Sequence, residues 1–337
     1  MCSGSLLIRA SKALKELIKQ LEKGNRISEK EYQRKLFKDV LTYTAKGLEE
    51  IRVPILSAPY KRVFVILPSN VPHIGIQLLP LLEAYRLEVF FKLPSREKLF
   101  MKNFLQLLRW EKFEADYLSY GETLKKIREY DFVVAFGSSA VERFLKAAGK
   151  PYRFFGPKFS FAFAERLSSG DLYGIMADFL SFDTEGCLST RFLFVKEEPE
   201  LGMLEESLEK AAALYPPQNT FDVDLFYYYS RVNLYFSKKH LISDSEAVFF
   251  VERMPEYFPP RTLFLVKIDS MEDVVEFLGD AVESVQAITT SDGKAIPFFE
   301  SKTSVSLFLK FGRSQFPPIF WLFEKGVTLE NFFEVNN

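Results

Sequence analysis

Cys187 lies in the segment Asp183-Thr184-Glu185-Gly186-Cys187-Leu188-Ser189, between a predicted helix and a predicted strand. A Gly-Cys pair at such a junction is a place where a fold can present a thiolate to a substrate carbonyl. The other cysteine, Cys2, is at the N-terminus, so the chain can build neither a disulfide framework nor a thiolate metal cluster. A lone interior cysteine is more often a small apolar core residue, so other parts of the chain must decide between the two roles.

Asn70 is a second candidate, because it lies in the turn Pro68-Ser69-Asn70-Val71-Pro72 after a predicted strand. The two prolines restrict the backbone of this turn. An amide held in this way could donate a hydrogen bond in an oxyanion hole. On spacing alone, an asparagine that serves only turn formation is the better interpretation.

A phosphate site must be built without the two commonest motifs, because the chain contains neither G-x-G-x-x-G nor a Walker A loop. The substitute is Phe136-Gly137-Ser138-Ser139, between a predicted strand and a predicted helix. Its glycine lets the backbone approach a phosphate, and the helix start offers N–H donors and the positive end of the helix dipole. Turns of this kind are also common as simple helix caps.

Polar residues follow another predicted strand at the same edge of the sheet. The Lys92 ammonium could hydrogen-bond a cofactor ribose, and Ser95, a predicted helix cap, is assigned to the same cofactor site. Arg96, at the start of that helix, could pair with a 2′-phosphate. The alternative for these residues is a solvated basic surface turn.

Short apolar runs alternate with helical patterns along the first half of the chain. Residues 5–50 favour two amphipathic helices. Strands are expected at 63–67, 87–91 and 132–136, and helices at 74–85, 95–108 and 140–148. This alternation indicates a doubly wound α/β domain with a nucleotide site at the carboxyl ends of the strands.

After Cys187 the alternation begins again. Strands are expected at 191–195, 248–251, 262–267, 285–289 and 305–309, and helices at 201–214, 225–235 and 271–278. We therefore expect a cofactor-binding domain with the N-terminal helices at 1–182 and a catalytic α/β domain carrying the thiol at 183–311. A C-terminal segment, 312–337, is expected to pack across both.

The chain has 337 residues, of which 47% are hydrophobic and 26% charged, as in an ordinary soluble globular protein. Its 44 basic and 45 acidic residues give a net charge of −1, which argues against nucleic acid as a partner. The longest apolar stretch, 74–91, is interrupted by proline and charged residues, so we expect no integral membrane segment. The N-terminus lacks a signal-peptide pattern, and a cytoplasmic location follows most simply.

Two compositional features favour structural roles. The 36 phenylalanines indicate an aromatic core more than a cavity lined for a long apolar ligand. The two histidines, His73 and His240, are both expected to be structural, and no metal site can be assembled from them.

Taken together, these motifs resemble those of the aldehyde dehydrogenase superfamily. The Asn70 turn, Lys92, Phe136-Gly137-Ser138, Gly156-Pro157-Lys158-Phe159-Ser160-Phe161 and Gly186-Cys187-Leu188-Ser189 occur in its order and rough spacing. More closely, the chain is similar to the long-chain acyl-CoA reductase family that supplies aldehyde in bacterial luminescence. The stretch Gly312-Arg313-Ser314-Gln315-Phe316-Pro317-Pro318-Ile319-Phe320-Trp321 looks like that family's C-terminal signature.

The resemblance implies an aldehyde-dehydrogenase-like fold, with a Rossmann-type cofactor domain and an α/β catalytic domain. Cys187 would attack an acyl-CoA or acyl-carrier-protein thioester, while the Asn70 amide and the Cys187 backbone N–H hold the oxyanion. A nicotinamide hydride would then reduce the acyl-cysteine and release aldehyde. Relatives favour NADPH, with which Arg96 is compatible, and NAD stays open as the alternative cofactor. A homo-oligomer and an acyl-transferring partner enzyme also stay open.

The residues before the Gly-Pro-Lys turn bear on the branch of the superfamily. Enzymes that oxidise aldehydes to acids need a base to activate water, usually a Glu just before this turn, where the present chain has Phe154-Phe155. The missing base favours a reductase, and Glu185 is interpreted as a solvated loop residue because a carboxylate too near the thiol would raise its pKa. A cysteine acyltransferase or thioesterase would also need such a base.

Two further alternatives are kept. One is a short-chain acylating aldehyde dehydrogenase that uses NAD. The other is a catalytically silent binding relative, which the intact Cys187 and Asn70 argue against and which the shorter chain and the altered C-terminal motif favour. The chain is shorter than typical relatives, Thr190-Arg191 replaces the usual Pro-Gln after the thiol motif, and Glu324-Lys325-Gly326 replaces His-Asp-Gly.

Overall fold

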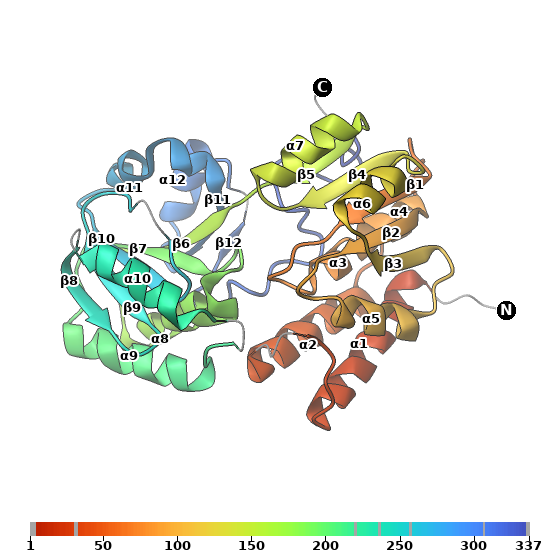
Figure 1. The fold of residues 1–337 in the computed structure, drawn as a ribbon. Helices are drawn as coiled ribbons and strands as arrows, with labels where there is room; N and C mark the ends of the chain where they lie inside the picture. Colours follow the sequence, from red (N-terminus) through yellow and green to blue (C-terminus); the bar gives the residue numbers. More distant parts are fainter. Residues whose placement is uncertain are drawn as a thin grey trace. The chain divides into compact units, whose positions relative to one another are not determined.

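The structure, a computed structural model, describes residues 5–29, 33–218, 221–234, 237–255, 258–305 and 307–334. The chain divides into two compact units, which Figure 1 shows coloured along the sequence. Unit 1 comprises Met1–Pro157 and Pro318–Asn337, and unit 2 comprises Lys158–Pro317. Within the described ranges, no helix is both long and apolar enough to cross a membrane.

Unit 1 is built on a five-stranded parallel sheet in the order β3-β2-β1-β4-β5. Its strands are β1 (Arg62–Ile66), β2 (Glu88–Leu93), β3 (Phe113–Tyr117), β4 (Phe132–Phe136) and β5 (Tyr152–Phe155). The chain runs outward from β1 to β3 and then returns to place β4 on the other side of β1. This reversal is the switch point at which doubly wound sheets bind ligands, and it confirms the expected α/β fold class.

Seven helices of unit 1 lie within its described residues: α1 (Leu6–Glu22), α2 (Arg34–Glu50), α3 (Ile74–Gln77), α4 (Leu79–Tyr85), α5 (Leu99–Leu108), α6 (Tyr120–Ile127) and α7 (Ser139–Ala148). The two expected N-terminal helices are confirmed, and they pack on each other. The expected cap at Ser95 is wrong, because α5 begins at Leu99. The Glu97 carboxylate, rather than the Ser95 hydroxyl, accepts a hydrogen bond of 3.1 Å from the Phe100 N–H.

Unit 2 contains a seven-stranded sheet in the order β12-β11-β6-β7-β10-β9-β8, parallel except for the edge strand β8. The strands are β6 (Phe159–Ala164), β7 (Thr190–Val195), β8 (Ser237–Ile242), β9 (Ala247–Val251), β10 (Thr262–Lys267), β11 (Val285–Thr290) and β12 (Phe308–Leu309). The helices are α8 (Ser169–Leu180), α9 (Leu201–Leu214), α10 (Val223–Leu234), α11 (Met271–Leu278) and α12 (Ala295–Lys302), with 3₁₀ turns η1 (Ser181–Thr184) and η2 (Gly279–Ser284).

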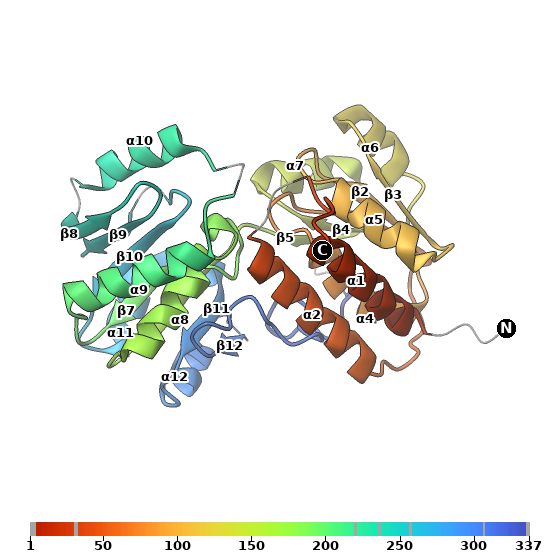
Figure 2. The ribbon, with the colours of Figure 1, turned by 90° about the horizontal axis from the view of Figure 1, so that it is seen from below.

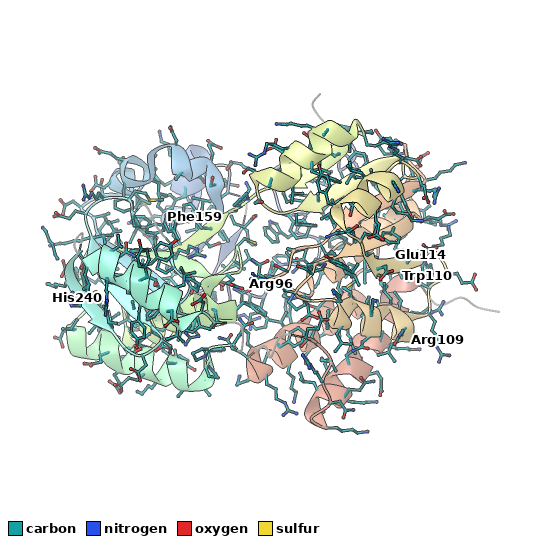
Figure 3. All side chains as sticks on the ribbon, viewed as in Figure 1. Arg96, Arg109, Trp110, Glu114, Phe159 and His240 are labelled. Carbon is teal, nitrogen blue, oxygen red and sulfur yellow. The ribbon has the colours of Figure 1, made fainter. Side chains whose placement is uncertain are left out.

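Helices cover both faces of this sheet, as Figure 2 shows. Alternate strand residues point to opposite faces, so Leu193 and Leu265 pack under α8 and α9. Their neighbours Phe194 and Phe264 instead face a cluster that contains residues of α10, α11 and α12. The phenylalanines of β6, β7, β9 and β10 therefore form an aromatic core, the favoured interpretation of the composition. Figure 3 labels Phe159 at the start of β6 and His240 on the exposed edge strand β8.

The boundaries of the two units differ from the expected domain boundaries, which were 1–182, 183–311 and 312–337. The first boundary lies at Pro157 rather than Asp183, because β6 pairs with β7 and β11 and so belongs to the sheet that carries the thiol loop. The C-terminal segment is also divided. Residues up to Pro317 belong to unit 2, whereas Phe323 packs in unit 1 on Phe136 and Phe155, with ring centroids 5.1 and 5.0 Å apart.

Candidate active site

Cys187 follows a stretch of backbone with an unusual conformation. After α8 ends at Leu180, the residues Phe182, Asp183 and Thr184 have φ values of 51°, 54° and 62°. This is the left-handed region, which costs a residue with a side chain about 1–2 kcal/mol. Three such residues in succession persist only when the surrounding structure holds them, and strain of this kind clusters at functional sites.

Side-chain hydroxyls fasten this stretch and the thiol segment to the protein. Thr184 Oγ1 donates to the Phe179 carbonyl at 2.8 Å, and Ser189 Oγ donates to the Ser181 carbonyl at 2.7 Å. From β6, Ser160 Oγ donates to the carbonyl oxygen of Cys187 itself at 2.7 Å. The backbone on either side of the thiol is thereby tied to α8 and to the sheet.

A buried ion network lies beside the same stretch. Arg261, which is 0% exposed, donates to Asp183 Oδ1 at 2.8 Å and contacts the Glu246 carboxylate as well. It also donates to the carbonyl oxygens of Tyr215 and Ser245, so each of its three guanidinium nitrogens donates a hydrogen bond. Burial raises the pKa of Asp183, and the Arg261 charge opposes that rise. Removing one partner from such a network leaves a buried charge uncompensated.

Cys187 as a residue is partly exposed, but the electrostatics of its thiol differ from the expectation of a ready thiolate. Burial raises its pKa to about 11, while the backbone N–H groups of Cys187 and Leu188 and the Lys158 ammonium act in the opposite direction. At neutral pH this thiol is therefore protonated, and a nucleophilic role requires that a proton be removed as the thiol attacks. Glu185, the nearest carboxylate in sequence, acts electrostatically on Asp183 and Arg191.

The Gly312-Arg313-Ser314-Gln315 stretch packs against the same loop within unit 2. The Asp178 carboxylate of α8 accepts backbone hydrogen bonds from Gly312 at 2.8 Å and Ser314 at 2.9 Å. Gln315 Nε2 then donates to Ser189 Oγ at 3.3 Å, two residues beyond the thiol. A Cβ on Gly174 of α8 would come within 3.0 Å of the Gly312 nitrogen, so a glycine is required for this close approach.

Unit 1 holds a separate cavity of about 340 Å³ at the carboxyl edge of its sheet. Its walls come from the ends of β1 and β2, from the β3–α6 connection and from α7, and they comprise Ile66, Lys92, Ser95, Tyr117, Leu118, Ser119, Tyr120, Thr123, Ala140, Val141 and Phe144. The cavity therefore brings the predicted Lys92 and Ser95 together with the start of α7, which follows Gly137 and Ser138. Arg96, labelled in Figure 3, is exposed and is not part of the lining.

The sequence interpretation missed the β3–α6 wall of this cavity. Its Ser119 accepts from the Glu122 N–H, and the Glu122 carboxylate accepts from the Ser119 N–H, which is a capping box. The Ser-x-x-Glu pattern was therefore a readable signal for a helix start at this place. Tyr117, which precedes it, lies 5.6 Å from the Lys92 ammonium and 4.3 Å from that of Lys98, measured to the ring centroid.

Features of this cavity suit an anionic ligand. Burial lowers the pKa of Lys92, so its half-buried ammonium gains from a negative partner. The α7 cap residue Ser138 makes no side-chain cap hydrogen bond, and the Val141 N–H donates to the Ser138 carbonyl, which leaves the N–H groups of Ser139 and Ala140 for a ligand. A Cβ on Gly137 would come 2.7 Å from Val141 Cγ2, so only glycine fits this approach to the helix.

Asn70 lies in unit 1, half-buried, in the segment that follows the carboxyl end of β1. Of the two histidines, His73 is buried, which lowers its pKa to about 4, and His240 is exposed on β8. In the part of the chain that the structure describes, no group of His, Cys, Asp and Glu could hold a metal ion. Cys2 lies outside the described residues.

The architecture is that of the aldehyde dehydrogenases. An oxidoreductase from Marinobacter aquaeolei is similar to the chain with a TM-score of 0.73 at 14% identity, over 98% of this chain and 83% of that one. Aldehyde dehydrogenase 21 from Physcomitrella patens, in complex with the reaction product succinate, gives 0.68 at 13% identity over 92% and 78%. Indole-3-acetaldehyde dehydrogenase from P. syringae, in complex with NAD⁺ and IAA, gives 0.66 at 12% over 91% and 75%. The expected aldehyde-dehydrogenase-like fold is confirmed.

The family follows from the sequence. The LuxC acyl-CoA reductase family model matches residues 117–305, which is more than half of the chain and includes Cys187. The chain belongs to the LuxC acyl-CoA reductase family, as the resemblance indicated, and is an oxidoreductase of acyl and aldehyde chemistry. No curated protein sequence matches it significantly.

Proposed function

We propose that the protein reduces a long-chain acyl thioester, delivered by CoA or an acyl-carrier protein, to a fatty aldehyde with NADPH. The observation that carries the proposal is Cys187, the only cysteine in the chain after Cys2, at the end of a left-handed stretch fastened by buried hydrogen bonds. Such a cost in backbone strain is reasonable where one thiol must be held in one position.

Chemistry at Cys187 proceeds in two halves. The sulfur attacks the thioester carbonyl and an acyl-cysteine forms, while the thiol proton passes to the CoA or carrier sulfur, which leaves as a free thiol. When bound, the nicotinamide supplies a hydride to the acyl carbon. The thiohemiacetal then collapses to aldehyde and restores the Cys187 thiol. Both halves place negative charge on the same oxygen, so one pair of donors, assigned here to the Asn70 amide and the Cys187 N–H, serves twice.

The cavity in unit 1 fits the adenosine half of a nicotinamide cofactor. Lys92 and Ser95 would bind ribose hydroxyls, and Gly137 and Ser138 would let a pyrophosphate reach the first N–H groups of α7. Arg96, exposed beside Ser95, would pair with the 2′-phosphate of NADPH. The choice of NADPH over NAD rests on Arg96, whereas the other residues would bind either nucleotide.

The residues before Gly156 support reduction rather than oxidation to an acid. Phe155 is buried and stacks on Phe136 with ring centroids 4.8 Å apart, and Phe154 packs against the core of unit 1. A hydrolytic dehydrogenase requires a carboxylate here to activate water. A thioester reductase does not, because its acyl-enzyme is discharged by hydride.

The test is turnover with NADPH and acyl-CoAs of increasing length, followed by cofactor absorbance and by aldehyde released, with NADH and acyl-carrier protein in parallel. The proposal predicts stoichiometric aldehyde and NADP⁺, an optimum at long chains, and loss of both in Cys187→Ala. A short-chain optimum with NADH would instead support the short-chain acylating dehydrogenase.

One observation favours a second candidate, a catalytically silent binding relative. Burial raises the pKa of the Cys187 thiol to about 11, opposite to the shift that activates most catalytic cysteines. Absence of turnover with every thioester and both cofactors, together with retained nucleotide binding, would support this candidate.

A further inference from the structure

The left-handed stretch before Cys187 is bound to a second loop far away in the sequence. The Arg261 N–H donates to the Asp183 carbonyl at 3.1 Å, and the Arg261 guanidinium donates to the Asp183 carboxylate at 2.8 Å. Arg261 is itself left-handed, with φ 50°, so both sides of this contact are in a conformation that their side chains disfavour. The left-handed backbone at Asp183 and Arg261 is required neither by the strands of the sheet nor by a regular helix.

A second arginine completes the connection. Arg191, in β7, donates to the Thr184 carbonyl at 2.6 Å, and its other terminal nitrogen donates to the carbonyls of Phe258 at 3.3 Å and Pro259 at 3.4 Å. The two arginines thus join Asp183 and Thr184 to residues 258–261 by side-chain and backbone hydrogen bonds. We call these two residues the arginine clamp.

The clamp reaches further into the unit through Asp183. The second carboxylate oxygen, Oδ2, accepts from the Gln218 N–H at 3.0 Å, after α9, and Arg261 also binds Glu246 and the Tyr215 carbonyl. Four connections of the polypeptide, α8–β7, α9–α10, β8–β9 and β9–β10, therefore converge on one buried charge cluster, four residues before the thiol. A charge cluster that only stabilised the fold could lie anywhere in the core, and apolar side chains of similar volume would stabilise the fold equally well.

We propose that Arg261 and Arg191 are positioning residues for Cys187. By holding the left-handed stretch they set the path of the backbone into Gly186, and so the place and the accessibility of the Cys187 sulfur. Neither arginine touches the substrate in this account. For its effect on turnover the inference rests on the proposed function, but the accessibility of the thiol can be measured without substrate or cofactor.

The experiment uses the full chain with Cys2→Ser, so that Cys187 is the sole thiol. Arg191→Met and Arg261→Lys are compared with Val274→Ala, a cavity substitution in α11 that loosens the aromatic core of the same unit. Circular dichroism and urea unfolding first show that each variant is folded. The rate of alkylation of Cys187 by iodoacetamide is then measured from about pH 7 to about pH 11, a range that reaches the midpoint of its titration.

In the clamp variants the relaxed stretch exposes the sulfur. We expect alkylation at neutral pH to rise about fivefold or more and the thiol pKa to move down toward its ordinary value. Val274→Ala should change the alkylation rate by less than about twofold and should leave the thiol pKa unchanged, because it removes packing without releasing the left-handed stretch. In turnover assays kcat should fall about tenfold in the clamp variants while the KM for NADPH is unchanged.

Alkylation profiles that match the parent's in both folded clamp variants would overturn the inference. If Arg261→Lys does not fold, Arg191→Met decides, because it removes hydrogen bonds to carbonyls and leaves the buried Asp183 carboxylate paired with Arg261. A parent that shows no turnover would count against the proposed function alone, and the alkylation result would still decide the role of the clamp.

Discussion

The Ser160 hydroxyl donates a hydrogen bond of 2.7 Å to the carbonyl oxygen of Cys187. Ser160 is fully buried in β6 and stands opposite Thr190 of β7 in the sheet register. The backbone of the candidate nucleophile is thus tied to a central strand rather than to another loop. Sites held by rigid strands are more accurately positioned than sites held by loops alone.

Removal of this hydroxyl provides the first prediction. Ser160→Ala should cost about 1 kcal/mol of unfolding free energy and slow acylation of Cys187 about three- to tenfold, because the Cys187 carbonyl loses its buried donor. Urea unfolding and single-turnover acylation measure the two effects. Ser207→Ala, a buried serine of α9 in the same unit, is the control and should leave acylation unchanged. Equal acylation rates for the two variants would exclude a positioning role for Ser160.

The second prediction concerns Lys158, whose positive charge lowers the pKa of the Cys187 thiol against the effect of burial. Lys158→Met should raise that pKa further and slow alkylation of Cys187 at about pH 9 several-fold, since fewer chains then carry the thiolate. Lys158→Arg keeps the charge and should behave as the parent does. An identical pH profile of alkylation in the methionine variant would show that Lys158 does not act on the thiol.

The third prediction tests the assignment of the cofactor. Arg96→Met should weaken NADPH binding about tenfold and leave NADH binding unchanged, because the guanidinium would contact only the 2′-phosphate. Lys92→Met, on the cavity wall, should weaken both nucleotides. Titration calorimetry measures the affinities, and Arg128→Met, at the far end of α6, is a control of equal charge change. If Arg96→Met leaves both affinities unchanged, Arg96 has no part in cofactor choice.

The fourth prediction is a pH dependence of stability. Burial raises the pKa of Asp178 from 3.8 to about 7, so the folded state holds this proton more tightly than the unfolded chain does. Its contribution to stability is therefore full below about pH 4 and is lost as the pH rises through about 7. Relative to Asp178→Asn, the parent should lose on the order of 4 kcal/mol of unfolding free energy across this range.

Urea unfolding at a series of pH values measures the difference in unfolding free energy between the parent and Asp178→Asn. The test is how this difference changes with pH. Asparagine keeps one of the two acceptor oxygens, so the substitution loses the hydrogen bond from either the Gly312 or the Ser314 N–H, and this loss shifts both ends of the series equally. Asp244→Asn, an exposed position in the same unit, should give a flat difference. A flat difference for Asp178→Asn as well would contradict the raised pKa.

Elements with a strong local pattern could be predicted from the sequence, and those held by distant partners could not. The apolar runs of β1, β4 and β10 predicted strands within one residue of their bounds, and α9 and α11 begin and end as expected. The left-handed stretch at 182–184 was not predictable, because its strain is balanced by Arg261, which lies far along the chain.

The residues of the candidate sites also fall into those that the sequence could predict and those that it could not. Cys187, Lys92 and Gly137 could be found because their types and their places at strand ends carry chemistry. Tyr117 and the rest of the β3–α6 wall were missed, since β3 is half-exposed and its pattern is weak. The raised pKa of the thiol could not be foreseen either, because burial of one side chain depends on the packing of the whole unit.

The central claim is a covalent acyl group on Cys187, and the most direct measurement is the intact mass of the protein after mixing with a long-chain acyl-CoA in the absence of NADPH. The account predicts one acyl group per chain, located on the peptide that contains Cys187, absent in Cys187→Ala, and released as aldehyde when NADPH is added. An acyl group on another residue, or one that persists in Cys187→Ala and still yields aldehyde, would contradict it.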